Sequence, residues 1–293
     1  MTGEDGDLQA EAPFRLLSPV GEAASPLVFA SPHSGRLYPK GAGFDPDLSE
    51  LSLRSAEDAL VDRLIEGAPE RGIPVLLATH GRAWLDLNRA PTDLDPTLID
   101  DLPTGSEGGP RAQSGYGVVP RLTGDGRPLY RDCISLSEVT GRIEAAHGPY
   151  HAALDALMEQ TRARHGVAVL IDWHSMPGPR ASPPAKRPVA AFPQIVLGDR
   201  HGVACGTALT RRVAALLGGE GLRVALNQPY AGGWTTERWG RPGEGFHALQ
   251  IEISRALYLD EALMQPGAGW ARSQGIINRL IDSLAREARD LVS

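Results

Sequence analysis

The sequence predicts an α/β protein built around a mostly parallel sheet. Short apolar runs alternate with amphipathic stretches along the chain, which is the pattern of β-α-β units. Several apolar runs end abruptly in polar or histidine residues, as strands do when their carboxyl ends carry a site. A length of 293 residues and a hydrophobic content of 42% suit a large core. We expect one domain over residues 1–293, with residues 1–14 as a flexible N-terminal tail.

Short apolar runs bounded by turn-forming residues predict the strands of the sheet. In chain order, these predicted strands are Leu27–Ser31, Pro74–Thr79, Val167–Asp172, Gln194–Leu197, Leu222–Leu226 and Ala248–Ile253.

Amphipathic stretches between these runs predict the helices. In chain order, they are Asp58–Ala68, Glu138–Arg164, Gly202–Leu217 and Trp270–Val292. For the second of them, Ser137 is a suitable N-cap and Gly166 a suitable stop.

Two segments, Pro91–Pro128 and Met176–Pro193, are rich in glycine or proline and predict long loops. Long loops in compact domains are often functional. The second segment begins just after His174 and could cover a site there, although a mobile surface loop without a function explains it equally well.

The composition argues against several classes of partner. A net charge of −7 disfavours nucleic acid and anionic membrane surfaces, and no apolar run reaches the ~20 residues of a membrane-spanning helix. Cys133 and Cys205 form no CxxC pair, which disfavours a disulfide scaffold and fits a reducing compartment. The acidic start Met1–Asp7 is the reverse of a secretory leader. We expect a cytoplasmic protein with a small-molecule partner.

Two histidines stand where predicted strands end. The run Leu27–Ser31 leads to His33, and the run ending in Asp172 and Trp173 leads to His174. Because ligands collect at the carboxyl ends of strands in open α/β sheets, the two imidazoles could converge on one metal ion. Each histidine alone is more simply explained as a hydrogen-bonded strand end. The pair, together with a nearby acid, indicates a metal-dependent hydrolase.

The third ligand of such a metal would be a carboxylate. A catalytic zinc usually takes three protein ligands from histidine and carboxylate and leaves one position for water. The start of the first predicted helix offers Glu57, Asp58 and Asp62. A carboxylate in a first helical turn points toward the same end of the sheet as the preceding strand. The residues themselves leave the choice among these three open.

Glu252 is a candidate general base. It alternates with apolar residues on a predicted strand, so Glu252 and Gln250 share one face. Desolvation between isoleucines should raise the pKa of Glu252. That suits a group which takes a proton from metal-bound water and passes it to a leaving nitrogen. An edge-strand acid in a salt bridge explains the pattern equally well.

Asn88 and Arg89 end another apolar patch and could hold a carboxylate, the arginine in bidentate fashion. An arginine that caps carbonyls or pairs with a neighbouring acid is the alternative. The segment Gly232–Arg238 begins with two glycines that would let the backbone approach a ligand, although ordinary turn chemistry explains it nearly as well. His147 and His151 lack the glutamate of an HExxH motif, so we expect packed or surface histidines.

Taken together, these motifs resemble the N-formylglutamate amidohydrolase family, which is related to zinc carboxypeptidases and to the aspartoacylase and succinylglutamate desuccinylase group. The resemblance runs from about Pro26 to Leu259. It rests on the order and spacing of Pro32-His33-Ser34-Gly35, Glu57-Asp58, Asp86-Leu87-Asn88-Arg89, Asp172-Trp173-His174-Ser175, Gly232-Gly233 with Thr236, and Gln250-Ile251-Glu252.

The resemblance implies a three-layer α/β/α fold of the phosphorylase/hydrolase type, with a mixed, mostly parallel sheet. It also implies cleavage of an N-acyl amide, in the best-known members of N-formylglutamate to formate and glutamate. By position, His33, Asp58 and His174 look like the metal ligands, with Glu57 as the alternative to Asp58. Glu252 looks like the general base and acid.

The same resemblance makes Asn88 and Arg89 look like the clamp for the amino-acid carboxylate, with Gly233 and Thr236 also on the substrate side. The family often has an arginine directly after this threonine, whereas Thr236 is followed by Glu237. The departure concerns the specificity for the substrate's side chain.

We therefore expect a single catalytic domain that binds one Zn²⁺, or another divalent metal, and hydrolyses an N-formyl or short N-acyl acidic amino acid. Zinc would polarise the amide, Glu252 would relay the proton, and Arg131 would help to hold the oxyanion. Two alternatives are a zinc deacylase or carboxypeptidase-like hydrolase of other N-acyl amino acids or peptides, and a non-catalytic amino-acid-binding protein. The sequence leaves the oligomeric state open.

Overall fold

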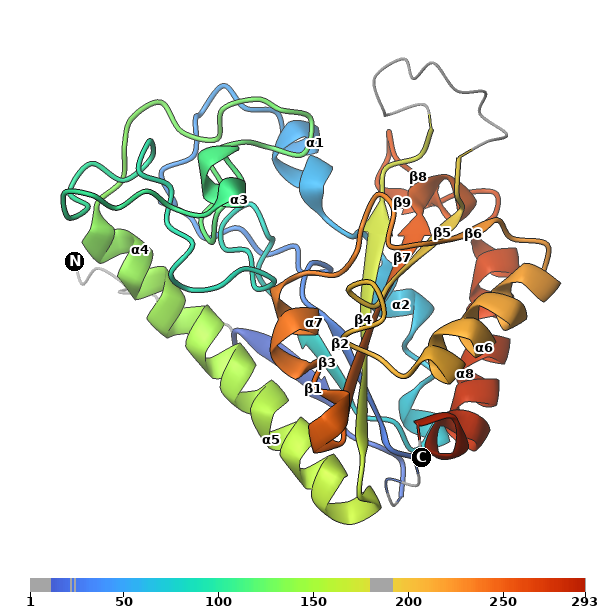
Figure 1. The fold of residues 1–293 in the computed structure, drawn as a ribbon. Coiled ribbons are helices and arrows are strands. Elements are labelled where there is room, and N and C mark those ends of the chain that lie inside the picture. Colours follow the sequence, from blue (N-terminus) through green and yellow to red (C-terminus); the bar gives the residue numbers. More distant parts are fainter. Residues whose placement is uncertain (1–11, 22, 24, 180–191, 293) are drawn as a thin grey trace, which may run out of the picture.

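The computed structural model describes residues 12–21, 23, 25–179 and 192–292, and Figure 1 shows a central sheet between two helical layers. Its strands are β1 (Phe14–Leu17), β2 (Leu27–Ser31), β3 (Val75–Ala78), β4 (Ala168–Met176), β5 (Ile195–Gly198), β6 (Val224–Leu226) and β7 (Phe246–Ser254). The spatial order is β1-β3-β2-β4-β7-β5-β6. The β1–β3 and β5–β7 pairings are antiparallel and the others parallel. The predicted three-layer α/β/α fold with a mixed, mostly parallel sheet is confirmed.

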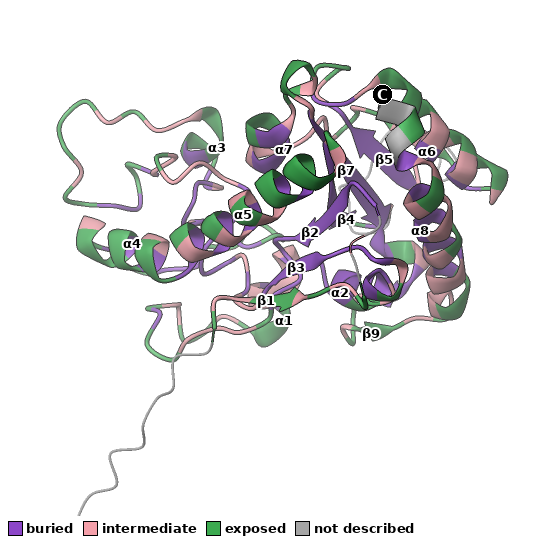
Figure 2. Ribbon diagram, turned by 90° about the horizontal axis from the view of Figure 1, so that it is seen from below, coloured by how far each residue is buried: buried purple, intermediate pink, exposed green. Residues whose placement is uncertain are grey.

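The central strands are buried on both faces, which explains why β2 and the first half of β4 appear in the sequence as continuous apolar runs. Along β2, Leu27 and Phe29 pack into one core layer, while Val28 and Ala30 pack into the other. This alternation follows from the two-residue period of a strand. Figure 2 shows the buried strands between half-exposed helices.

Each core layer has its own helices. The first layer contains α2 (Val61–Leu64), α6 (Thr207–Gly219) and α8 (Trp270–Val292). The second contains α4 (Leu136–Arg142), α5 (Gly148–His165) and α7 (Trp234–Trp239). The remaining elements are the single turns α1 (Glu50–Leu53) and α3 (Pro110–Gln113), the 3-10 turns Arg54–Ala56, Pro69–Arg71, Pro242–Glu244 and Arg255–Leu257, and the small pair β8 (Leu259–Asp260) and β9 (Gln265–Pro266).

The predicted strands agree with the observed strands to within a few residues at their ends, and β2 agrees fully. β4 extends past its predicted end, so His174 lies inside the strand. The helix predicted over residues 138–164 is present as α4 and α5, joined by a π-helical turn at Ile143–His147, and it stops at Gly166 as predicted. Its predicted N-cap is wrong: α4 begins at Leu136, and the side chain of Ser135, not Ser137, accepts from the Glu138 N–H. α8 has the predicted bounds.

One helix prediction is wrong. Residues 58–68 form only the single turn α2. It begins late because Leu60 has a φ of 64°, in the left-handed region that an α-helix does not contain, and it ends at Leu64 because the backbone of Ile65 (φ −107°, ψ 5°) leaves the helical region. The segment 232–238 shows the opposite difference: it was predicted to be a loop, but it is helical from Trp234 onward, as α7. The predicted helix at 202–217 starts later, at Thr207.

The predicted tail falls mostly outside the described residues, which begin at residue 12, and Phe14 already pairs with Ala78 in the sheet. Of the predicted loop 176–193, residues 180–191 lie outside the described part of the chain. Within the described part, no helix combines the length and the apolar character needed to cross a bilayer. The cytoplasmic location stays a prediction.

Candidate active site

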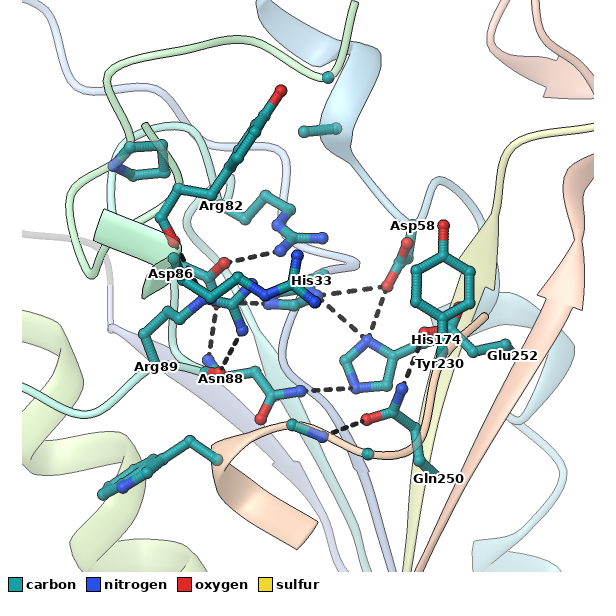
Figure 3. Close-up of a pocket in the computed structure, with 18 of the residues that line it drawn as sticks. His33, Asp58, Arg82, Asp86, Asn88, Arg89, His174, Tyr230, Gln250 and Glu252 are labelled. Carbon is teal, nitrogen blue, oxygen red and sulfur yellow. Dashed lines mark hydrogen bonds and ion pairs between the residues drawn. The ribbon is translucent and has the colours of Figure 1, made fainter. Parts of the chain in front are cut away.

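A cavity of about 750 Å³ lies at the carboxyl ends of β2, β4 and β7. His33 comes just after β2, His174 lies near the end of β4, and Glu252 lies on β7 directly across from His174. All three line the cavity, and Figure 3 shows both histidine side chains together with Asp58. The segment 91–128, which was predicted to be a long loop, forms a further wall of the cavity.

His33, Asp58 and His174 form a buried group that could hold a metal ion. The Nδ1 atoms of His33 and His174 are 3.1 Å apart. Oδ2 of Asp58 lies 3.0 Å from Nδ1 of His174 and 3.5 Å from Nδ1 of His33. Three potential ligand atoms therefore face one small volume.

Carboxylates behind the imidazoles fix which nitrogen faces this volume. Nε2 of His33 donates to Asp86 at 2.7 Å, and Nε2 of His174 lies 3.0 Å from the carboxylate of Asp172. With a proton on each Nε2, both Nδ1 atoms present lone pairs, which repel each other and the Asp58 oxygen unless a cation lies among them. Burial lowers the pKa of His174, but Asp172 and Asp58 outweigh it and raise that pKa well above its usual value. The site is built to hold positive charge.

The orientation of Asp58 comes from residues far away in the chain. Ser175 donates to Oδ1 of Asp58 at 3.0 Å, and Nη2 of Arg255 is 3.7 Å from the same oxygen. The backbone N–H of Asp58 donates to the carbonyl of His33 at 2.9 Å. With Oδ1 engaged, Oδ2 is directed toward the histidines.

The other two candidate carboxylates are engaged elsewhere. Glu57 accepts a hydrogen bond from Tyr38 at 2.8 Å and pairs with Arg54. Asp62 pairs with Arg36 at 2.5 Å. The structure thus brings Asp58, and neither of its neighbours, to the two histidines.

Glu252 occupies an interior strand, because β7 lies between β4 and β5. The amide nitrogen of Gln250 donates to Oε1 of Glu252 at 2.8 Å, so the two side chains share one face as expected. Among the described residues Glu252 forms no ion pair, which argues against the edge-strand salt bridge. Burial raises the pKa of Glu252 to about 7.

Arg89 and Asn88 both line the cavity. Arg89 donates to the carbonyls of Tyr116 at 3.0 Å and Asn88 at 2.9 Å, which leaves most of its five N–H groups free. The amide oxygen of Asn88 accepts from the Thr235 N–H at 2.8 Å, and its amide nitrogen lies 3.2 Å from Nε2 of His174. Asn88 therefore links α7 to the metal-ligand group in addition to facing the cavity.

The segment 232–238, called the glycine loop below, packs directly against Asn88. A Cβ atom on Gly233 would lie 2.4 Å from the Asn88 amide nitrogen, so only glycine fits there. The N–H of Gly233 already donates to Gln250 at 2.9 Å. Thr236 is fully buried behind Gly232 and does not line the cavity.

Arg131, the predicted oxyanion helper, does not reach the site. Its half-exposed side chain forms ion pairs with Asp45 at 2.9 Å and with Asp47. Nothing in the local sequence indicated these partners, which lie more than 80 residues earlier.

Arg82 and Tyr230 also line the cavity, and neither was predicted from the sequence. Arg82 donates to Oδ2 of Asp86 at 2.6 Å. Burial raises the pKa of Tyr230, and the charge of Glu252 raises it further, so the phenol lies near this acid. Both residues lie outside helices and strands, where the local sequence does not reveal the direction of a side chain.

His147 and His151 support the segment that carries Arg89. Nε2 of His147 donates to the carbonyl of Arg89 at 2.9 Å, and Nε2 of His151 donates to that of Leu87 at 2.8 Å. Both rings pack against Trp234, with centroids 5.2 and 4.5 Å from its ring. Burial lowers the pKa of His151 to about 3, so this ring is neutral. The two histidines are packed, as expected, but they also hold a wall of the cavity.

Replacing His151 by leucine is expected to lower the free energy of unfolding by about 1–3 kcal/mol, because the buried carbonyl of Leu87 loses its donor. His151→Gln retains an N–H near the Nε2 position and should lose less. Urea denaturation of both variants measures the difference. Equal losses would show that the hydrogen bond contributes nothing.

Comparison with known proteins gives consistent matches. The profile of the N-formylglutamate amidohydrolase family matches residues 25–259. An N-formylglutamate deformylase from Pseudomonas aeruginosa is 31% identical over 272 residues, covering 90% of this chain and 94% of the relative. One from Pseudomonas putida is 28% identical, covering 80% and 82%. The crystal structure of an N-formylglutamate amidohydrolase from Ralstonia eutropha JMP134 matches with a TM-score of 0.87 and 36% identity, covering 95% of this chain and 99% of that one.

Proposed function

Because this chain belongs to the N-formylglutamate amidohydrolase family and is an amide-bond hydrolase, we propose that it hydrolyses N-formyl-L-glutamate to formate and L-glutamate. The observation that carries this proposal is the convergence of His33, Asp58 and His174 in one cavity with Glu252. The partner is a small molecule.

We propose that His33, Asp58 and His174 hold one Zn²⁺ ion per chain. Ligand atoms of a tetrahedral zinc site are about 3.3 Å apart, given bonds of about 2.0–2.2 Å. The separations of 3.0, 3.1 and 3.5 Å in this group suit that geometry. A bound zinc ion supplies Lewis-acid polarisation of the carbonyl and a lowered pKa for a water molecule.

Glu252 is the proposed general base and then acid. Gln250 engages Oε1, so Oε2 is the atom available to take a proton from the attacking water. The same oxygen then delivers this proton to the amide nitrogen as the carbon–nitrogen bond breaks, which lets the amine leave as a neutral group. The place of Glu252 across from His174 keeps the acid beside the reacting carbon.

Arg89 is the proposed receptor for the α-carboxylate of the substrate, and the amide nitrogen of Asn88, which lines the same cavity, is a proposed second donor to that group. Arg82, rather than Arg131, is proposed to face the carbonyl oxygen as negative charge develops on it. Arg82 lines the cavity and retains donors beyond its bond to Asp86. Such positioning accounts for a large part of the barrier lowering in bimolecular reactions.

Zinc-loaded protein is expected to release one formate for each N-formyl-L-glutamate consumed, as measured by an enzyme-coupled formate assay. Removal of the metal by a chelator should abolish the release, because the three proposed ligands then hold no Lewis acid. Added Zn²⁺ should restore it. Metal-loaded protein that releases no formate would exclude this substrate.

A substrate panel separates the proposal from its alternatives. Faster cleavage of N-acetyl amino acids or of a peptide would identify a deacylase or carboxypeptidase-like enzyme. Tight binding of an amino acid by metal-free protein, without hydrolysis, would identify a binding protein.

A further inference from the structure

The cavity has a second basic region beside the proposed carboxylate receptor. The segment 91–128 contributes Arg111, on the single turn α3, to the same cavity that contains the metal-ligand group. N-formylglutamate carries two carboxylates, whereas Arg89 and Asn88 account for one. The second carboxylate needs its own cationic partner in the cavity.

Five arginines line the cavity, and the side chains of four of them already bind side chains or backbone carbonyls. The partners are Asp86 for Arg82, the carbonyls of Tyr116 and Asn88 for Arg89, Glu237 for Arg200, and Ser175 with the Ser55 carbonyl for Arg255. The side chain of Arg111 makes no hydrogen bond or ion pair with any residue in the described part of the chain. Arg111 is thus the cavity arginine whose five donors all remain free.

Arg111 also lies close enough to Arg89 for their charges to interact. Burial lowers the pKa of Arg89, and the charges of Arg82 and Arg111 lower it further. Two guanidinium groups that repel each other across a cavity are both stabilised when an anion binds each of them. A substrate with two carboxylates satisfies this arrangement better than one with a single carboxylate.

We propose that Arg111 binds the side-chain carboxylate of the substrate, so that Arg89 and Arg111 together select N-formyl dicarboxylic amino acids. This inference rests on the proposed function. It assigns the side-chain specificity to the segment 91–128, which contributes Arg111 to the wall of the cavity, and not to the glycine loop at 232–238. Glu237 in that loop is paired with Arg200 at 3.2 Å and presents an acid to the cavity.

The test compares N-formyl-L-glutamate with N-formyl-L-glutamine, which has the same shape but no side-chain charge. Zinc-loaded wild-type protein should prefer the glutamate substrate in kcat/KM by about 10- to 100-fold, the range of a charged hydrogen-bonded contact. Arg111→Gln should reduce this preference to about two-fold or less, mainly by raising KM for the glutamate substrate. Arg111→Lys should recover part of the preference, because the charge returns without the planar fork.

Arg127→Gln is the matched control, since Arg127 is an exposed arginine of the same segment that does not line the cavity. The Arg127→Gln variant should prefer N-formyl-L-glutamate to N-formyl-L-glutamine by the same factor as the wild-type protein. An unchanged preference in Arg111→Gln, or equal loss on both substrates, would overturn the role of Arg111 while leaving the proposed function intact. Failure of the wild-type protein to cleave N-formyl-L-glutamate would instead overturn the proposed function, and the role of Arg111 with it.

Discussion

Replacing Glu252 by glutamine is expected to lower kcat for formate release by about 10²- to 10⁴-fold, the range typical of a lost general acid–base. Glutamine has nearly the same shape, and its amide oxygen can still accept from Gln250. Its amide nitrogen, however, cannot take a proton from water or return one to the leaving amine. The metal ligands are untouched, so the zinc content should equal that of the wild type.

Steady-state kinetics and elemental analysis of the same preparation give both quantities. Glu244→Gln is the matched control, because Glu244 is an exposed glutamate shortly before β7. Near-normal kcat in Glu252→Gln would remove Glu252 from the mechanism. Loss of zinc in that variant would instead mean that Glu252 acts on the metal site.

The second large effect concerns the metal. His174→Ala is expected to lose both bound zinc and measurable turnover. It removes one of three proposed ligand atoms and leaves the buried carboxylate of Asp172 without the ring nitrogen that lies 3.0 Å from it. An uncompensated buried charge is costly, so a lower melting temperature should accompany the loss.

Elemental analysis of folded, gel-filtered protein measures this effect. His247→Ala, which removes a buried histidine of β7 that accepts from the Gly206 N–H, should keep its zinc. Asp86→Asn should be intermediate, because a group that orients a ligand typically contributes 10- to 100-fold in metal affinity. Full zinc occupancy in His174→Ala would refute the proposed ligand set.

The strands that carry the site could be predicted because strands buried on both faces have a simple, largely apolar sequence pattern. β2, β4 and β7 are buried on both faces, so β2 and the first half of β4 appear as continuous apolar runs, and β7 is an apolar strand with single polar residues at intervals. A histidine or glutamate that interrupts such a run is conspicuous, and this is how His33, His174 and Glu252 were found. The tips of three adjacent parallel strands then bring these side chains to one place.

The turns could not be predicted in the same way. The left-handed backbone at Leu60 keeps residues 58–60 out of the helix that the apolar spacing predicts, so α2 begins only at Val61. From the sequence alone, Arg82 and Arg131 are equally good candidates for a cavity arginine. Contacts with Asp86 in one case, and with Asp45 in the other, decide which of the two reaches the cavity.

By itself, then, the sequence determined the α/β fold class, the central strands and the two histidines with Glu252, because strand periodicity is a local property of the chain. Only the tertiary structure decided that Asp58, and not Glu57, meets the histidines. The two acids are adjacent in the sequence but have different partners. Ser175, 117 residues after Asp58, donates a hydrogen bond to Asp58, whereas Tyr38 and Arg54 engage Glu57. Side-chain direction at a turn depends on partners from distant parts of the chain, and no local pattern records those partners.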